Sequence, residues 1–155
     1  MDRRFNRSIE TDSSNQTEKM AAKIGAKLKG GEVMELISDL GGGKTTFVKG
    51  LVSGSGSEAY VSSPSFTLRN DYAGPKLSIA HFDFYRLKDP GILSQMLAEA
   101  MSDPATVVII EWGGIVDAIL PPDHVKVTIK VSGETKRLFE MDCPMRFKYL
   151  FEGIK

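Results

Sequence analysis

The chain has 155 residues, of which 41% are hydrophobic and 26% charged, a composition typical of one globular domain rather than a disordered, collagen-like or coiled-coil chain. Twenty Lys and Arg balance 20 Asp and Glu, so no overall charge would hold nucleic acid or an anionic membrane nonspecifically. The single cysteine, Cys143, excludes an internal disulfide. The longest aliphatic run, residues 107–110, is too short to span a bilayer. We therefore expect a single domain over residues 1–155, cytoplasmic and without membrane contact.

The N-terminal part predicts one strand and one helix. Residues 4–9 form either a short edge strand or a loose arm. Asn15, followed three residues later by Glu18, resembles a helix N-cap and its reciprocal acid, which predicts a helix over residues 16–29. Three lysines recur at helical spacing and form either a solvated face or a docking surface for an acidic partner or RNA: Lys19, Lys23 and Lys27.

The remaining chain alternates strands and helices. Strands are predicted at residues 32–37 and 106–112, hairpins at 63–85 and 124–141, helices at 45–52 and 91–101, and a short helix in the tail after residue 144. This order predicts an α/β fold of the P-loop NTPase type, with three layers and a mixed sheet. Its core strands are parallel and its edge hairpins antiparallel.

A glycine-rich segment lies between the strand at 32–37 and the next helix. It reads SDLGGGKT and matches the phosphate-binding pattern G-x-x-x-x-G-K-[ST] except at Ser38, where the pattern has glycine. Such a loop directs backbone N–H groups at phosphate oxygens, with Lys44 at the β- and γ-phosphates and the Thr45 hydroxyl on Mg²⁺. The residues expected to contact the nucleotide are Asp39, Leu40, Gly41, Gly42, Gly43, Lys44, Thr45, Thr46, Ser65 and Trp112.

Two acids at strand ends complete this site. Asp83 lies in HFDFYR, and Glu111 follows the apolar run VVII, as an acid does at the carboxyl edge of a parallel strand. Mg²⁺ prefers oxygen ligands, and an attacking water must be held in line with the leaving phosphate. We expect Asp83, Glu111 and Lys44 to be catalytic, and Thr45, Asp83 and Glu111 to hold Mg²⁺. Which acid ligates the metal directly is left open.

Four nearby residues have two interpretations each. Arg69 and Arg86 are candidates to neutralise charge on the γ-phosphate, or ordinary surface arginines. His81 shares a face with Asp83 and is either a structural histidine or an orienting group. Trp112, the only tryptophan, either packs in the core or contacts the nucleotide region.

Four segments in this order, DLGGGKTTF, SPSFTL, HFDFYRL and IIEW, resemble the TsaE family over residues 17–141. The resemblance implies an ATPase that works with TsaB and TsaD in synthesis of threonylcarbamoyladenosine at position 37 of tRNA, with ATP and Mg²⁺ as cofactors and tRNA contacted only through the complex. It implies a switch-like loop at residues 62–67. Ser38, Gly42 and Ser65 depart from the family pattern, and the segment after Met141 has no evident counterpart.

Three other functions compete with this one. A GTPase is suggested by the D-x-x-G string at residues 71–74, but the chain has no N-K-x-D segment to read guanine. A small-molecule kinase would need an acceptor pocket and an arginine-rich lid, which residues 84–105 do not provide. A nucleotide-gated binding module without hydrolysis is supported by Ser38 and is retained as the alternative.

Overall fold

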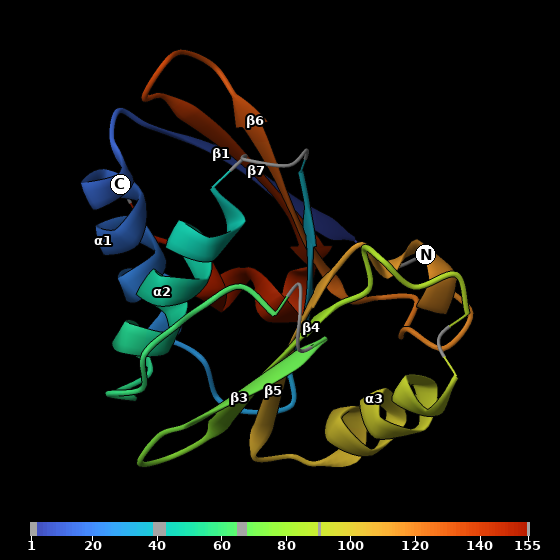
Figure 1. The fold of residues 1–155 in the computed structure, drawn as a ribbon. Coiled ribbons are helices and arrows are strands. Elements are labelled where there is room, and N and C mark those ends of the chain that lie inside the picture. Colours follow the sequence, from blue (N-terminus) through green and yellow to red (C-terminus); the bar gives the residue numbers. More distant parts are fainter. Residues whose placement is uncertain (1–2, 39–42, 65–67, 90, 155) are drawn as a thin grey trace.

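The computed structural model describes residues 3–38, 43–64, 68–89 and 91–154. Within them the chain alternates strands and helices around one sheet (Figure 1). The elements are β1 (Arg4–Thr11), α1 (Ser14–Gly25), β2 (Val33–Ile37), α2 (Lys44–Gly54), β3 (Arg69–Ala73), β4 (Ser78–Asp83), α3 (Ile92–Ser102), β5 (Thr106–Glu111), η1 (Gly113–Val116), β6 (Val125–Val131), β7 (Arg137–Pro144) and η2 (Met145–Leu150).

Seven strands form a mixed sheet in the order β1-β7-β6-β2-β5-β4-β3. Strands β6, β2, β5 and β4 run parallel, and β3, β7 and β1 join them in antiparallel pairs. The interior strand β5 is almost entirely buried because both of its faces are covered, which explains its unbroken aliphatic sequence. The predicted fold class, with its parallel core and antiparallel hairpins, is therefore confirmed.

Helices cover the two faces of the sheet unequally. Figure 1 shows α1 and α2 together on one face and α3 on the other, which gives three layers. The α1–α2 pair is tightly packed, since a Cβ at Gly50 would clash with the Glu18 carbonyl and the Ala21 methyl. The core on this side continues through Met34, Leu36 and the inward side of β6 and β7, whereas a second core beneath α3 contains Phe82, Phe84 and Leu97.

The N-terminal strand and helix differ in detail from their predictions. Residues 4–11 form an edge strand against β7 rather than a loose arm. The helix begins earlier than expected and is capped by Ser13, whose Oγ accepts a hydrogen bond from Gln16 N at 3.1 Å. Asn15 is thus inside the helix, and the prediction that Asn15 and Glu18 cap it was wrong. Ser and Asn cap helices about equally well, so local preference could not choose between them.

The C-terminal tail is part of the core, although no role could be predicted for it. Phe151 and Ile154 are buried against the α1–α2 side of the sheet. Arg7 of β1 donates hydrogen bonds to the carbonyls of both residues, at 2.6 Å to Phe151. Tyr149 Oη donates to Glu32 Oε2 at 2.6 Å, and burial raises the pKa of this phenol. The expected short helix is a 3₁₀ helix, η2.

The bounds of two strands also differ from the prediction. The first hairpin strand begins at Arg69, whereas residues 63–72 were expected to be extended. Strand β5 ends at Glu111 rather than at residue 112, because Trp112 adopts a left-handed conformation with φ of 57°.

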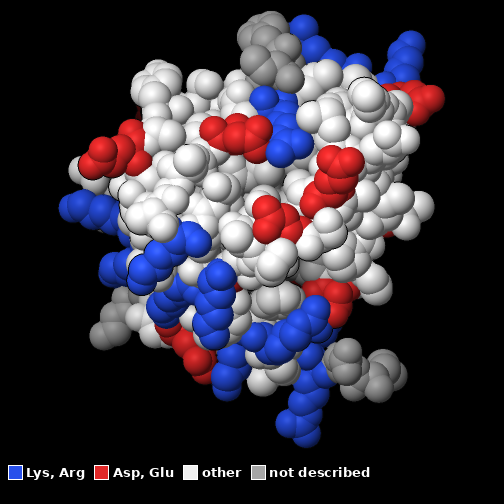
Figure 2. Space-filling view, turned by 90° about the horizontal axis from the view of Figure 1, so that it is seen from below, with Lys and Arg blue, Asp and Glu red and all other residues white. Residues whose placement is uncertain are grey.

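Charge is unevenly distributed although the total is balanced. Figure 2 shows Lys and Arg gathered mainly in the lower half of that view, with Asp and Glu mainly in the upper half. Among the described residues, no helix has both the length and the apolar character needed to cross a membrane.

Candidate functional site at the ends of the parallel strands

The two predicted acids end neighbouring parallel strands. Asp83 is the last residue of β4 and Glu111 the last residue of β5, and the two are direct partners in the strand register. Adjacent strands lie about 4.8 Å apart, so both acids occur at the same point of the carboxyl edge. Each side chain is 3% exposed. Two carboxyl groups from distant parts of the sequence are therefore buried side by side.

Helix α2 begins at this same edge and brings Lys44 to the acids. Lys44 Nζ lies 4.0 Å from Glu111 Oε1 and 3.3 Å from the Ser38 carbonyl oxygen, and the side chain is 9% exposed. Gly43 precedes the helix with φ of 99°, a conformation that favours glycine. A buried ammonium requires compensating partners, and here a carboxylate and a carbonyl provide them.

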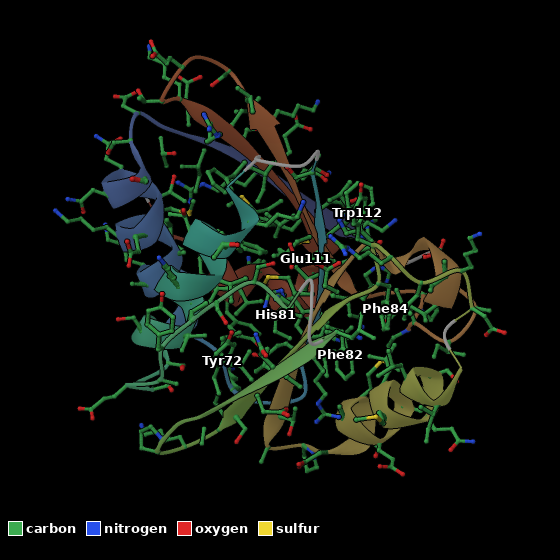
Figure 3. The ribbon with its side chains drawn as sticks, viewed as in Figure 1. Tyr72, His81, Phe82, Phe84, Glu111 and Trp112 are labelled. Atoms are coloured by element: carbon green, nitrogen blue, oxygen red, sulfur yellow. The ribbon has the colours of Figure 1, made fainter. Side chains whose placement is uncertain are left out.

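The carboxylate of Glu111 is bound at its other oxygen by His81. His81 Nε2 lies 2.7 Å from Glu111 Oε2, and the imidazole is 1% exposed. Figure 3 shows His81 and Glu111 between α2 and the sheet, whereas Phe82 and Phe84 point toward α3. The alternation of strand β4 thus separates polar site residues from apolar core residues, as the sequence predicted for Phe82, Asp83 and Phe84.

Asp83 is oriented by its own backbone turn. Its Oδ1 accepts a hydrogen bond from Tyr85 N at 2.9 Å, just after strand β4 ends. This bond fixes the orientation of the carboxylate at the strand end where Glu111 also lies.

Trp112 lies at the rim of the site rather than in the core. Its side chain is 36% exposed, its ring lies 5.2 Å from Lys44 Nζ, and it packs against Tyr85 at 4.8 Å between ring centroids. Trp112 and Leu68 are the non-glycine residues with positive φ in the described chain, and both flank the site. Strained backbone of this kind clusters at functional sites. Ser38 does not share it, so serine at that position carries no left-handed strain.

Several predicted contacts fall outside the described residues: Asp39, Leu40, Gly41, Gly42 and Ser65. Thr45 and Thr46 are described and half-buried in the first turn of α2, where helical N–H groups have no acceptor within the helix. No group of three or more His, Cys, Asp and Glu side chains that could hold a metal occurs in the described ranges. Mg²⁺ is commonly held by one or two carboxylates together with phosphates, so Thr45, Asp83 and Glu111 fit that ion.

A second group of polar residues beside α2 was missed from the sequence. Because β6 runs parallel to β2, the β6–β7 turn lies at the same edge as the start of α2. Arg137 Nε lies 3.9 Å from where a Gly43 Cβ would be. Residues from α1, α2 and this turn line a cavity of about 240 Å³: Ser14, Thr17, Gly43, Thr46, Glu134, Thr135 and Arg137. The turn SGET predicted only a hairpin, since nothing in it indicates which loop it approaches.

Neither arginine candidate is buried as the two acids are. Arg69 pairs with Asp71 at 3.0 Å and stacks over Phe82 at 5.0 Å, which places it on the sheet face opposite Glu111. Asp71 belongs to the D-x-x-G string, which therefore lies on a surface strand and not at the strand ends. Arg86 is exposed.

Comparison with known proteins identifies the family of the chain. Residues 11–139 match the family model "Threonylcarbamoyl adenosine biosynthesis protein TsaE". Relatives described as tRNA threonylcarbamoyladenosine biosynthesis protein TsaE include those of Bacillus subtilis (32% identity, 82% of this chain and 79% of the relative) and Rickettsia prowazekii (33% identity, 82% and 88%). A third relative, from Treponema pallidum, is 34% identical over a match that covers 81% of this chain and 92% of the relative.

A solved structure extends the likeness to the tail. The crystal structure of Bacillus subtilis YdiB superposes with a TM-score of 0.77 at 26% identity and covers 99% of this chain and 97% of its own. The family model ends at residue 139, but this coverage includes the segment after Met141, so the expectation that the tail has no counterpart was wrong. By family model, relatives and fold, the chain belongs to the TsaE family of tRNA threonylcarbamoyladenosine biosynthesis.

Proposed function

We propose that this protein is a Mg²⁺-dependent ATPase that serves threonylcarbamoyladenosine synthesis as an accessory subunit of TsaB and TsaD. One observation carries the proposal: Lys44, Glu111 and Asp83 are buried together where α2 begins. Burying an ammonium and two carboxyl groups is unfavourable unless they are compensated, and such groups concentrate at functional sites.

The triphosphate would bind at the N-terminus of α2. Helix N-termini attract phosphate oxygens, because their first N–H groups have no acceptor within the helix and the helix dipole has its positive end there. Lys44 would exchange its contact with the Ser38 carbonyl for the β- and γ-phosphates. The nucleoside would then extend into the cavity beside Gly43, where Glu134 and Arg137 offer both an acceptor and donors.

The acids supply the remaining chemistry. Mg²⁺, held by the Thr45 hydroxyl and by Asp83 or Glu111, would neutralise charge on the phosphates. The carboxylate that does not hold the metal would accept a hydrogen bond from the attacking water and orient it toward the γ-phosphate. Lys44 would stabilise the charge that develops on the phosphate oxygens, since its ammonium already faces Glu111 across 4.0 Å.

Hydrolysis would reset or remodel the transferase complex between turnovers, with tRNA contacted only through TsaB and TsaD. Membership of the TsaE family supports this assignment to threonylcarbamoyladenosine synthesis. The alternative is a nucleotide-gated binding module without significant hydrolysis. It is favoured by Ser38 in place of the first glycine of the phosphate-binding pattern.

A paired experiment separates these functions. Cognate TsaB and TsaD are used to capture the chain with and without MgATP, and phosphate release is measured in a single turnover under both conditions. We expect ATP-dependent capture and phosphate release that is faster with the partners. Capture without any release would favour the binding module, and neither capture nor ATP binding would contradict both functions.

A further inference from the structure

His81 is one of two histidines in the chain and lies inside the candidate site. It belongs to β4, two residues before Asp83, and its register partner on β5 is Ile109, two residues before Glu111. Histidine and carboxylate are therefore staggered along adjacent strands and face the same side of the sheet. Their contact, 2.7 Å from Nε2 to Oε2, is fully enclosed because the imidazole is 1% exposed and Glu111 3%.

The two oxygens of Glu111 have different neighbours. Oε2 contacts His81, whereas Oε1 faces Lys44 at 4.0 Å. Rotation about the terminal torsion of glutamate is soft, so a carboxylate with only one neighbour could turn freely. With His81 in place, the hydrogen bond at one oxygen fixes the plane of the carboxylate, so the other oxygen stays directed toward Lys44.

The geometry also indicates which nitrogen of His81 carries the proton. An ionised carboxylate only accepts hydrogen bonds, so Nε2 must donate to Glu111. Nδ1 is buried and has no hydrogen-bond partner among the residues that the structure describes. A proton there would leave a second buried N–H without an acceptor, which is unfavourable. The ring is therefore expected as the Nε2–H tautomer.

We propose that His81 is a positioning residue for Glu111. Its Nε2–H holds Oε2, so that Oε1 is directed toward Lys44 and the space in which the γ-phosphate and attacking water would lie. This inference rests on the proposed ATPase function. His81 touches no reacting atom and acts only through Glu111, so its loss should reduce turnover while MgATP binding is largely retained.

The chain offers a matched control in its other histidine. His124 Nε2 contacts Glu35 Oε1 at 2.8 Å, and both side chains are buried. His124 directly precedes β6, at the amino edge of the parallel strands, whereas Glu111 ends β5 at the carboxyl edge. Equal substitutions at His81 and His124 therefore remove the same kind of contact inside and outside the site.

The first test measures the single-turnover rate and MgATP affinity of full-length variants. His81→Phe keeps a planar ring without a donor, and we expect turnover to fall about 10- to 100-fold, as for other groups one contact removed from a reactive centre. Affinity should change less than about threefold. His81→Gln restores an N–H near the position of Nε2 and should recover part of the rate. His124→Phe and His124→Gln should retain the wild-type rate.

Other outcomes would overturn the proposal. These are a wild-type rate for His81→Phe, an equal loss of affinity and rate, or an equal loss in His124→Phe. If His81→Phe does not fold, His81→Asn replaces it, because its shorter amide cannot reach Glu111; it must then be slower than His81→Gln. If the wild-type protein binds ATP but releases no phosphate, the ATPase function itself fails, and this inference fails with it.

A second test needs no nucleotide. With only two histidines, ¹⁵N NMR of the imidazole rings can be assigned by comparing the wild type with His81→Gln and His124→Gln. We expect the His81 signals to report the Nε2–H tautomer. An Nδ1–H tautomer would contradict the proposed hydrogen bond whatever the rate measurements give.

Discussion

The two buried histidine–glutamate pairs of this protein have nearly the same contact but different surroundings. His81 lies 2.7 Å from Glu111, and His124 lies 2.8 Å from Glu35. Glu111 faces the α1–α2 layer, whereas Glu35 alternates with core residues Met34 and Leu36 and so faces the opposite side of the sheet. A histidine–glutamate contact alone therefore does not show that the residues belong to a functional site.

The second nitrogen of each ring distinguishes the pairs. His124 Nδ1 lies 2.6 Å from the Pro121 carbonyl oxygen, which can only accept, so both ring nitrogens of His124 have acceptors. His81 Nδ1 has none in the part of the chain that the structure describes. His124 thus fastens the loop before β6 to strand β2, while His81 orients a carboxylate beside Lys44. The groups around each histidine–glutamate pair, and not the contact itself, therefore distinguish a site residue from a structural one.

The largest expected difference between the two pairs is in ATP hydrolysis when each glutamate is replaced. Glu111→Gln should reduce single-turnover ATP hydrolysis about 100- to 1000-fold, because an amide cannot act as a base or carry the negative charge that the site requires. MgATP affinity should change far less. Glu35→Gln is the matched control, and its rate should equal that of the wild type. If Glu111→Gln loses affinity and rate equally, the role of this acid is structural and not catalytic.

Removing the ammonium should have the next largest effect. Lys44→Ala removes a charge-assisted contact of about 1.5–3 kcal/mol, which corresponds to about a ten- to hundredfold loss of ATP affinity. Lys49, exposed on the same helix, provides the control, since Lys49→Ala should bind ATP as the wild type does. Titration calorimetry measures both. An unchanged affinity in Lys44→Ala would contradict the assignment of the phosphate site to α2.

The smallest expected effect concerns the pH dependence of stability. The hydrogen bond to Glu35 raises the pKa of His124 above its ordinary value of 6.5, burial opposes the rise, and the bond to Pro121 adds to it. A group whose pKa is raised by folding contributes stability that is fully present below the unfolded value and is lost as pH rises through the folded value. The pair should therefore stabilise the protein below pH 6.5 and progressively less at alkaline pH.

Urea unfolding of the wild type and His124→Gln at several pH values measures this contribution. The difference in free energy of unfolding between the two should be larger at acidic than at alkaline pH. A difference that grows as pH rises would show that His124 is not held in its charged form. Comparison with His81→Gln would then show whether the pairs also differ in how they contribute to stability.

Much of the site could be predicted because it depends on local sequence. The apolar run before Glu111, the alternation around Asp83 and the glycine-rich segment before Lys44 each indicate a strand end or helix start, which the structure has in those places. Parallel strands bring such ends to one edge, so Asp83 and Glu111 could be expected near each other. The family resemblance followed from the same segments and is confirmed.

Other features could not be predicted because they depend on partners distant in sequence. Arg137 approaches Gly43 only because the β6–β7 turn reaches the same edge as α2. The tail is held by Arg7, more than a hundred residues earlier, and no local pattern in either segment indicates that contact. The choice between the two interpretations of His81 likewise required the position of Glu111 on the neighbouring strand.

The sequence by itself determined the order of strands and helices, the α/β class, the phosphate-binding pattern and the family, because hydrophobic period and short motifs are local properties of the chain. Only the tertiary structure decided how the Glu111 carboxylate is oriented between His81 and Lys44, which histidine belongs to the site, and where the tail packs. These depend on the register between strands and on the closure of the sheet, which join residues that the chain keeps far apart.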